Sequence, residues 1–151
     1  MSICLLDTSI LCELLEVPHL CKDAGTILSA LEQKINDREA LLLPLSTIVE
    51  TGNHIGQNGD GQARRGAAER FVKLVRQALQ GQTPFTPTPF FETEELLTWL
   101  EEFPDWATRG SGIADLTIVK EWERQCQVHR SRHVYIWSTD RRHLSSYDRR
   151  P

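Results

Sequence analysis

The sequence predicts an α/β fold: a single domain over residues 1–151, built as a three-layer sandwich around a central, mostly parallel sheet. Three short apolar runs indicate buried strands, at residues 2–6, 40–46 and 133–138. Segments with helical periodicity separate these runs, and this alternation favours parallel strands joined by right-handed crossovers. A chain of this length can bury about 70% of the surface that its unfolded form exposes, so one core is sufficient.

Helices are predicted where apolar residues recur every three or four positions. In chain order, the predicted helices cover residues 8–16, 23–37, 47–55, a long amphipathic segment ending near Leu79, 92–103 and 111–127. The segment GQNGDGQARRG, residues 56–66, is expected to be a mobile loop because it is rich in glycine. The segment TPFTPTPFF, residues 83–91, is expected to be extended or an edge strand, because its prolines oppose helix formation.

Composition and charge exclude some classes of protein. No apolar run approaches the roughly 20 residues that span a bilayer, and no basic segment precedes the apolar N-terminus, so we expect a cytoplasmic protein without a membrane role. The net charge of −4 argues against unselective coating of nucleic acid. Up to Ala107 the chain has 8 basic and 16 acidic residues, and after it 9 basic and 5 acidic, so an acidic site can lie beside a basic rim.

The four cysteines form no C-x-x-C pair, and three of them fall in segments that are predicted to be buried. We interpret them as small core residues. Cys12, His19 and Cys21 could contribute to a zinc site, but a fourth ligand at a suitable spacing is missing, so zinc is not predicted.

Four carboxylates lie at junctions between predicted elements. Asp7 and Asp140 follow the first and third strands, Glu50 begins the helix after the second strand, and Asp115 begins the helix of ADLTIVKEW. Open α/β sheets bind their ligands beyond the carboxyl ends of the strands, where Asp7 and Asp140 must lie. We therefore expect the four side chains to converge at one edge of the sheet.

Each acid could also have a purely structural role at the start of a helix. Asp7 and Asp140 are suitable helix N-caps, and the spacing from Thr47 to Glu50 fits a capping box. Asp115 would be favoured at a helix N-terminus by the helix dipole. Any one acid is more simply a cap, whereas four acids on successive elements are harder to explain in this way.

Convergence of the four acids would require protons or cations. Two carboxylates about 4 Å apart repel each other by about 4 kcal/mol at an effective dielectric constant of 20. Hard oxygen ligands with open positions suit Mg²⁺ or Mn²⁺, and such sites support metal-assisted attack of water on a phosphodiester. The predicted cofactor is therefore Mg²⁺ or Mn²⁺.

Four segments carry a resemblance to a known family. In chain order they are LLDTSIL, PLSTIVE, GIADLTIV and STDRRHL. They resemble the four acidic motifs of the PIN-domain nucleases, which include the toxins of VapBC-type toxin-antitoxin pairs, and the order of the motifs is more specific than any one of them.

This resemblance implies a PIN-like fold and makes Asp7, Glu50, Asp115 and Asp140 the metal-binding acids. It also implies that Thr139 positions a carboxylate or a water molecule. Family members commonly add a fifth strand where this chain ends with SSYDRRP, so that edge of the sheet is expected to be absent or supplied by a partner.

Basic side chains are candidates for holding the phosphate backbone of a substrate. Arg109, Arg141 and Arg142 lie close in sequence to the third and fourth acidic motifs, and Arg64 and Arg65 precede the long amphipathic helix. A solvated helix face is the alternative, with equal weight, for the long helix. The glycine-rich segment lacks the G-K-[ST] ending of a P-loop and is interpreted as a lid or substrate loop.

The preferred hypothesis is a metal-dependent endoribonuclease, and RNA as its substrate comes from the resemblance. The resemblance also implies an antitoxin partner and a homodimer, for which Leu96, Leu97, Trp99 and Leu100 are candidates, with an intramolecular contact as the equal alternative. The second hypothesis is a PIN-like module that binds RNA or protein without cutting. A phosphatase of the haloacid-dehalogenase kind is disfavoured because Ser9 stands where that family needs a second aspartate.

Overall fold

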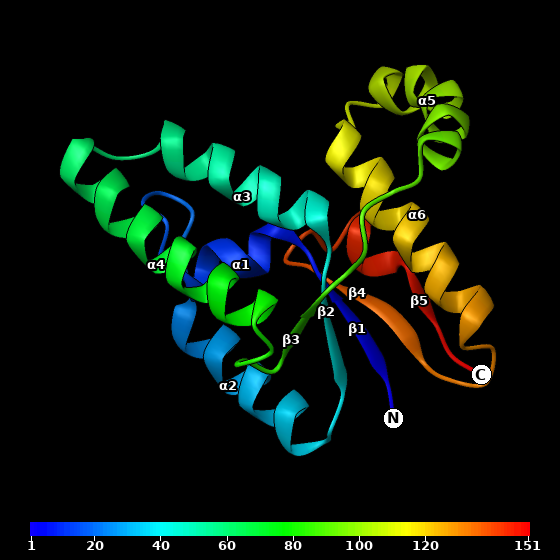
Figure 1. The fold of residues 1–151 in the computed structure, drawn as a ribbon, viewed down its shortest axis with the longest axis horizontal. Helices are drawn as coiled ribbons and strands as arrows, with labels where there is room; N and C mark the ends of the chain where they lie inside the picture. Colours follow the sequence, from blue (N-terminus) through cyan, green and yellow to red (C-terminus); the bar gives the residue numbers. More distant parts are fainter.

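The computed structural model describes residues 1–151 as an α/β fold around a five-stranded sheet of order β3-β2-β1-β4-β5 (Figure 1). The strands are β1 (Ile3–Leu6), β2 (Ala40–Leu43), β3 (Phe85–Pro87), β4 (Val134–Trp137) and β5 (Asp148–Arg149). The helices are α1 (Thr8–Leu14), α2 (Ala24–Asn36), α3 (Leu45–Gln57), α4 (Gly61–Leu79), α5 (Thr93–Thr108), α6 (Ile113–Val128) and the 3₁₀ helix η1 (Leu144–Ser146). All strand pairs are parallel except β4 with β5, which confirms the predicted α/β class with a mostly parallel sheet.

Helices cover both faces of the sheet, which therefore forms the middle of three layers. Successive side chains of a strand point to opposite faces. In β1, Cys4 and Leu6 pack in one core cluster with residues of α1 to α4, whereas Ile3 and Leu5 pack in a second cluster with residues of α5 and α6. Figure 1 shows α1, α2 and α4 on one side of the strands and α6 on the other. Burial of both faces explains why the strands are continuous apolar runs.

The order of the strands reverses at the centre of the sheet. From β1 the chain adds β2 and then β3 on one side, and β4 afterwards pairs with the free side of β1. Leu6 and Trp137 are in register at the carboxyl ends of β1 and β4, and the Asp7 amide donates a hydrogen bond to the Trp137 carbonyl at 3.0 Å. The segments that follow β1 and β4 therefore leave the sheet side by side, at the switch point where open α/β sheets bind ligands.

The start of α3 differs from the prediction. The predicted strand over residues 40–46 ends at Leu43, and the helix begins at Leu45, with Pro44 as its N-cap residue. Proline lacks an N–H group for the sheet, but its φ of −64° suits a helix N-terminus. Thr47 is thus inside α3 and donates a hydrogen bond to the Leu6 carbonyl at 2.7 Å, so the capping-box alternative is wrong.

The glycine-rich segment is mostly helical, so the expected loop at residues 56–66 is wrong. Asn58 donates a side-chain hydrogen bond to the His54 carbonyl at the end of α3. Gly59 has a φ of +83°, a conformation that favours glycine. The Asp60 side chain caps α4 by accepting a hydrogen bond from the Ala63 amide at 2.8 Å. Only a tight turn separates the two helices, which leaves no segment long enough for a lid.

The C-terminal edge of the sheet also differs from the expectation. The chain supplies a fifth strand of its own, but β5 has only two residues and runs antiparallel to β4. The Arg149 guanidinium donates hydrogen bonds to the carbonyls of His129, Arg130 and Arg132, in the turn before β4. These bonds hold the end of the chain against the sheet without a partner.

Residues 83–91 include β3, as the expectation of an edge strand requires. Helix α5 extends five residues beyond its predicted end at Phe103, with Pro104 inside it. None of the helices combines the length and apolar character needed to cross a bilayer.

Candidate active site

The four predicted acids line one cavity of about 220 Å³ at the switch point of the sheet. They come from four places in the fold: the end of β1, α3, the first turn of α6 and the turn after β4. The other lining residues are Thr8, Ser9, Cys12, Leu20, His54 and Leu144. The predicted convergence of acids that are far apart in the sequence is therefore observed.

Asp7 is buried, with 7% of its surface exposed, and it receives several hydrogen bonds on one oxygen. Its Oδ2 accepts from Ser9 Oγ and Ser138 Oγ, both at 2.8 Å, and from the Ser9 amide at 3.4 Å. The last bond makes Asp7 the N-cap of α1, so the capping explanation holds for this residue. Capping involves only Oδ2, and no group of the protein donates a hydrogen bond to Oδ1.

Glu50 lies in the second turn of α3, one turn later than predicted, because α3 begins at Leu45. Its Oε2 accepts a hydrogen bond of 2.6 Å from Thr8 Oγ1, and its Oε1 lies 3.9 Å from His54 Nε2. A residue of α1 therefore orients a carboxylate of α3 toward the cavity.

Asp115 and Asp140 are each held by backbone N–H groups. Asp115 accepts a hydrogen bond from the Gly112 amide at 3.1 Å, as expected for an acid in the first turn of a helix. Asp140 Oδ1 accepts from the amides of Arg142 and His143 at 3.1 and 3.2 Å, in a turn and not at the start of an α-helix.

Burial raises the pKa of Asp115, and the negative charges of Asp7 and Asp140 raise it further. The Gly112 amide and His143 act in the opposite direction and lower the pKa of Asp115. Burial likewise raises the pKa of the Cys12 thiol to about 12, with additional contributions from Asp7 and Glu50. Asp115 is thus close enough to Asp7 and Asp140 to interact with them electrostatically, and the cavity disfavours additional negative charge.

The hydroxyl that contacts the acids belongs to Ser138 and not to Thr139. Ser138 Oγ donates to Asp7 Oδ2 and accepts from the Asp140 amide at 3.0 Å, so it joins the carboxylates that follow β1 and β4. Thr139 is exposed, and only its backbone takes part, through a hydrogen bond from its amide to Ser9 Oγ. The contact with a carboxylate that was expected of Thr139 is therefore made by the residue before it.

The five candidate substrate-binding arginines separate into two groups. Arg141 and Arg142 are exposed in the turn that begins at Asp140, and Arg109 lies with its guanidinium 5.6 Å from the ring of Trp106. Trp106 also contacts His143, the side chain that lowers the pKa of Asp115. Arg141 and Arg142 therefore adjoin Asp140 of the acidic cavity, whereas Arg109 is linked to it only through Trp106 and His143, and none of the three lines it.

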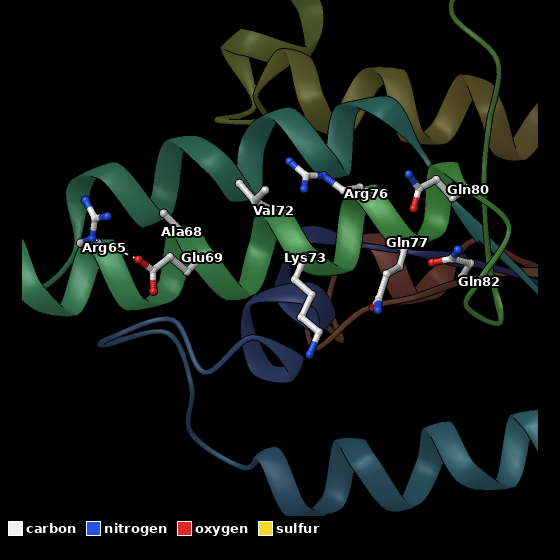
Figure 2. A pocket seen from close by; sticks show the side chains of 9 residues that line it. All are labelled: Arg65, Ala68, Glu69, Val72, Lys73, Arg76, Gln77, Gln80 and Gln82. Atoms are coloured by element: carbon white, nitrogen blue, oxygen red, sulfur yellow. Dashed lines mark ion pairs between the residues drawn. The ribbon is translucent and has the colours of Figure 1, made fainter.

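Arg64 and Arg65 lie elsewhere, near the start of α4, and no residue of α4 lines the acidic cavity. Arg65 borders a different, open cavity of about 610 Å³ along α4 and pairs with Glu69 at 3.0 Å (Figure 2). The two arginines therefore lie on a different part of the surface from the acids, and their contact with the phosphate backbone of a substrate stays a prediction.

Four side chains that shape the site were not predicted from the sequence. Thr8, Ser9 and Ser138 orient the carboxylates, and His143 modulates Asp115. The available signal was that hydroxyl residues directly follow Asp7 and directly precede Thr139 and Asp140. Which hydroxyl reaches which acid depends on the pairing of β1 with β4.

The donor set suits a hard divalent cation. No three carboxylate, imidazole or thiol groups are close enough together to hold an ion by themselves. Mg²⁺ commonly uses only one or two carboxylates and keeps several water ligands, so a site for it does not need three converged protein groups. Asp7 Oδ1, which accepts no hydrogen bond from the protein, and the other carboxylates of the cavity fit this chemistry.

Comparison of the chain with models of protein families, with curated protein sequences and with solved protein structures finds no match.

Proposed function

We propose that this protein is a PIN-like endoribonuclease that depends on Mg²⁺ or Mn²⁺. The observation that supports this proposal best is the shared cavity of Asp7, Glu50, Asp115 and Asp140 at the switch point of a mostly parallel sheet. The resemblance of the four motifs to PIN-domain nucleases lies in short sequence segments, whereas the cavity is a property of the tertiary structure. The two observations identify the same four residues.

Asp7, Glu50, Asp115 and Asp140 would hold the cation, directly or through water. A divalent cation bound there would orient the attacking water and neutralise negative charge on the scissile phosphate and its leaving oxygen. The products would carry 5′-phosphate and 3′-hydroxyl ends, as the resemblance implies.

The protein's own contribution is to hold the carboxylates in position before the cation and the substrate arrive. Hydroxyl groups fix Asp7 Oδ2 and Glu50 Oε2, so the remaining oxygens of both side chains can face the cavity. Outer hydrogen-bond partners of this kind commonly tune metal affinity by 10- to 100-fold. Burial and the neighbouring negative charges raise the pKa of Asp115 and so favour its protonated form when no cation is present.

Arg109, Arg141 and Arg142 would bind the phosphates on either side of the scissile bond. They are exposed and do not line the cavity, which leaves the carboxylates free for the cation. RNA in preference to DNA as the substrate, and cytoplasmic location, belong to this proposal through the resemblance.

Protein partners are part of the same proposal. A toxin-type PIN nuclease would have an antitoxin and would form a homodimer. Leu96 and Trp99 pack in the core next to α6, whereas Leu97 and Leu100 are exposed by 60% and 45%, so only the latter two offer a surface on α5 to a second copy.

The decisive experiment incubates the purified protein with end-labelled single-stranded RNA in Mg²⁺ or Mn²⁺. Wild type is compared with Asp7→Asn and Asp115→Asn, and with Asp105→Asn as a control acid that is exposed on α5. We expect cutting by the wild type and the control, and loss of cutting in both cavity variants. Absence of cutting with every cation, or equal cutting by all four proteins, would refute the proposal.

The second hypothesis, a PIN-like binding module, predicts a different result. RNA would be retained in a filter-binding assay by wild-type protein without being cut, and Asp7→Asn would bind it no more weakly. A thermal melt in Mn²⁺ separates the hypotheses further, because a cation at 100 times its dissociation constant stabilises the fold by about 2.7 kcal/mol. The nuclease hypothesis expects that this stabilisation is lost in Glu50→Gln.

A further inference from the structure

A second cavity adjoins the acidic one and has a different lining. It has a volume of about 480 Å³ and lies between α3, the segment before α5 and the start of α6. Its principal lining residues are Val49, Glu50, Asn53, Phe91, Leu96 and Ile113. Glu50 lines both cavities, so the two are adjacent on the protein surface.

We propose that this groove binds one unpaired nucleobase of the strand whose scissile phosphate lies at the four acids. This inference rests on the proposed nuclease function and names a subsite of it. The groove is called the base groove below.

The charge of the base groove decides which part of a nucleotide it can accept. No lysine or arginine lines it, and its one ionisable side chain is Glu50. A phosphate would be repelled there, whereas an uncharged and largely apolar group would not. Because a cation can occupy the acidic cavity, the phosphate belongs in that cavity and the base in the groove.

The apolar lining is suited to a flat aromatic ligand. Phe91 is partly buried, and its ring contacts the buried Trp99 edge to face, with 4.7 Å between the ring centroids and 72° between the ring planes. This contact holds the ring in one orientation. Val49 and Ile113 are exposed by 55% and 42%, so their apolar surfaces are accessible to a ligand in the groove. Proteins that bind single-stranded RNA commonly stack unpaired bases on such pre-oriented aromatic side chains.

One polar side chain of the base groove can read the edge of a base. Asn53 is exposed on α3, one turn after Val49, and its amide makes no hydrogen bond within the protein. An asparagine amide offers donors and an acceptor in one plane, which complement the edge of an unpaired base. Phe91 would therefore supply affinity, and Asn53 would orient the base.

The test measures cleavage of a short single-stranded RNA with one mapped cleavage site. A matched series of RNAs lacks the base, but not the ribose, at single positions on either side of that site. Phe91→Ala is compared with Phe90→Ala, because Phe90 is the adjacent residue, is 76% exposed and does not line the groove. Asn53→Ala is the second variant. Because the Asn53 side chain makes no hydrogen bond within the protein, this substitution tests the groove without disturbing the fold.

We expect Phe91→Ala to raise KM about tenfold, within the range that stacking of a base on an aromatic ring contributes, and Phe90→Ala to change KM less than twofold. One abasic position should raise the KM of the wild type to a similar extent and should cause little further loss in Phe91→Ala. Asn53→Ala should change the preference among bases at that same position. Because Phe91 also packs on Trp99, the melting temperature of Phe91→Ala is measured, and Phe91→Leu is included to keep the packing.

The subsite and the proposed function fail in different ways. If Asp7→Asn is inactive but Phe91→Ala and Asn53→Ala cut every RNA of the series like the wild type, the subsite is refuted and the nuclease proposal stands. If Val49→Asp converts a dimer to a monomer while KM is unchanged, the groove is a contact between copies and the subsite is again refuted. If the wild type cuts no RNA but adenosine monophosphate shifts the NMR signals of Asn53, Phe91 and Ile113, the nuclease proposal fails and base binding stands.

Discussion

Thr8 Oγ1 donates a hydrogen bond of 2.6 Å to Glu50 Oε2 and thereby joins α1 to α3 across 42 positions of the chain. Thr8 directly follows Asp7, so one short segment supplies a carboxylate to the cavity and orients a second carboxylate from another element. The acidic cavity is therefore supported by a set of hydroxyl groups whose individual contributions can be measured.

Replacing Thr8 with valine removes the hydroxyl and keeps the shape of the side chain. We expect Thr8→Val to need about tenfold more Mn²⁺ for the same rise in melting temperature, because Glu50 loses the hydrogen bond that orients it. Thr8→Ser retains a hydroxyl and should behave like the wild type. Titration of the melting temperature with Mn²⁺ measures the difference, and equal titrations for valine and serine would contradict the role assigned to Thr8.

Ser138 and Thr139 are neighbours with different expected effects. Ser138→Ala loses the hydrogen bond to Asp7 Oδ2 and the acceptor for the Asp140 amide, so we expect its cation affinity to fall by about tenfold. Thr139→Ala should change the affinity less than about twofold, because the Thr139 side chain is exposed and makes no hydrogen bond. Calorimetric titration with Mn²⁺ compares the two variants directly. A larger loss in Thr139→Ala would reverse the assignment.

Asp115 is expected to make stability depend on pH in the absence of cations. Its pKa is raised in the fold, by burial and by Asp7 and Asp140, so the fold favours its protonated form. Stabilisation by this group is fully present below its unfolded-state pKa and is lost as the pH rises through its folded-state pKa. The substitution Asp115→Asn removes the titrating group but keeps a side-chain oxygen that can accept the hydrogen bond from the Gly112 amide.

We therefore expect Asp115→Asn to be more stable than the wild type at neutral pH and to lose this advantage in acid. Urea unfolding in a chelating buffer, at several values between about pH 3 and pH 8, measures both proteins. A constant difference between them across the whole series would contradict the prediction.

Glu13 is a buried acid outside the cavity, with 5% of its surface exposed. Its oxygens accept hydrogen bonds from the amides of Lys22 and Asp23 and so fix the segment that leads into α2. We expect Glu13→Gln to lower the free energy of unfolding by about 1–3 kcal/mol, because an amide N–H₂ group would face backbone donors. The exposed Glu32→Gln is the control and should change it by less than about 0.5 kcal/mol.

The Mn²⁺ response separates this structural acid from those of the cavity. Glu13→Gln should keep the full rise in melting temperature, because Glu13 does not line the acidic cavity. If Glu13→Gln lost the rise in melting temperature as well as stability, Glu13 would also act on the acidic cavity.

Local physics explains which elements could be predicted. Buried parallel strands are continuous apolar runs, so β1, β2 and β4 were recognisable from short windows, and prolines indicated the extended edge strand β3. The predicted ends of helices and strands were wrong where a single residue sets the end. Pro44 ends β2 and starts α3, and Gly59 with Asp60 reduces a segment of loop-like composition to a tight turn.

The candidate site divides in the same way. The positions of Asp7 and Asp140 after strands, and of Asp115 at a helix start, follow from patterns within a few residues of each acid, so the sequence by itself determined which acids to consider. The tertiary structure alone decided that β4 pairs with β1, which brings Ser138 to Asp7 across 131 positions. It also decided that Arg64 and Arg65, on α4, do not line the acidic cavity. Strand order and helix direction result from packing among distant residues, and no short window of sequence contains that information.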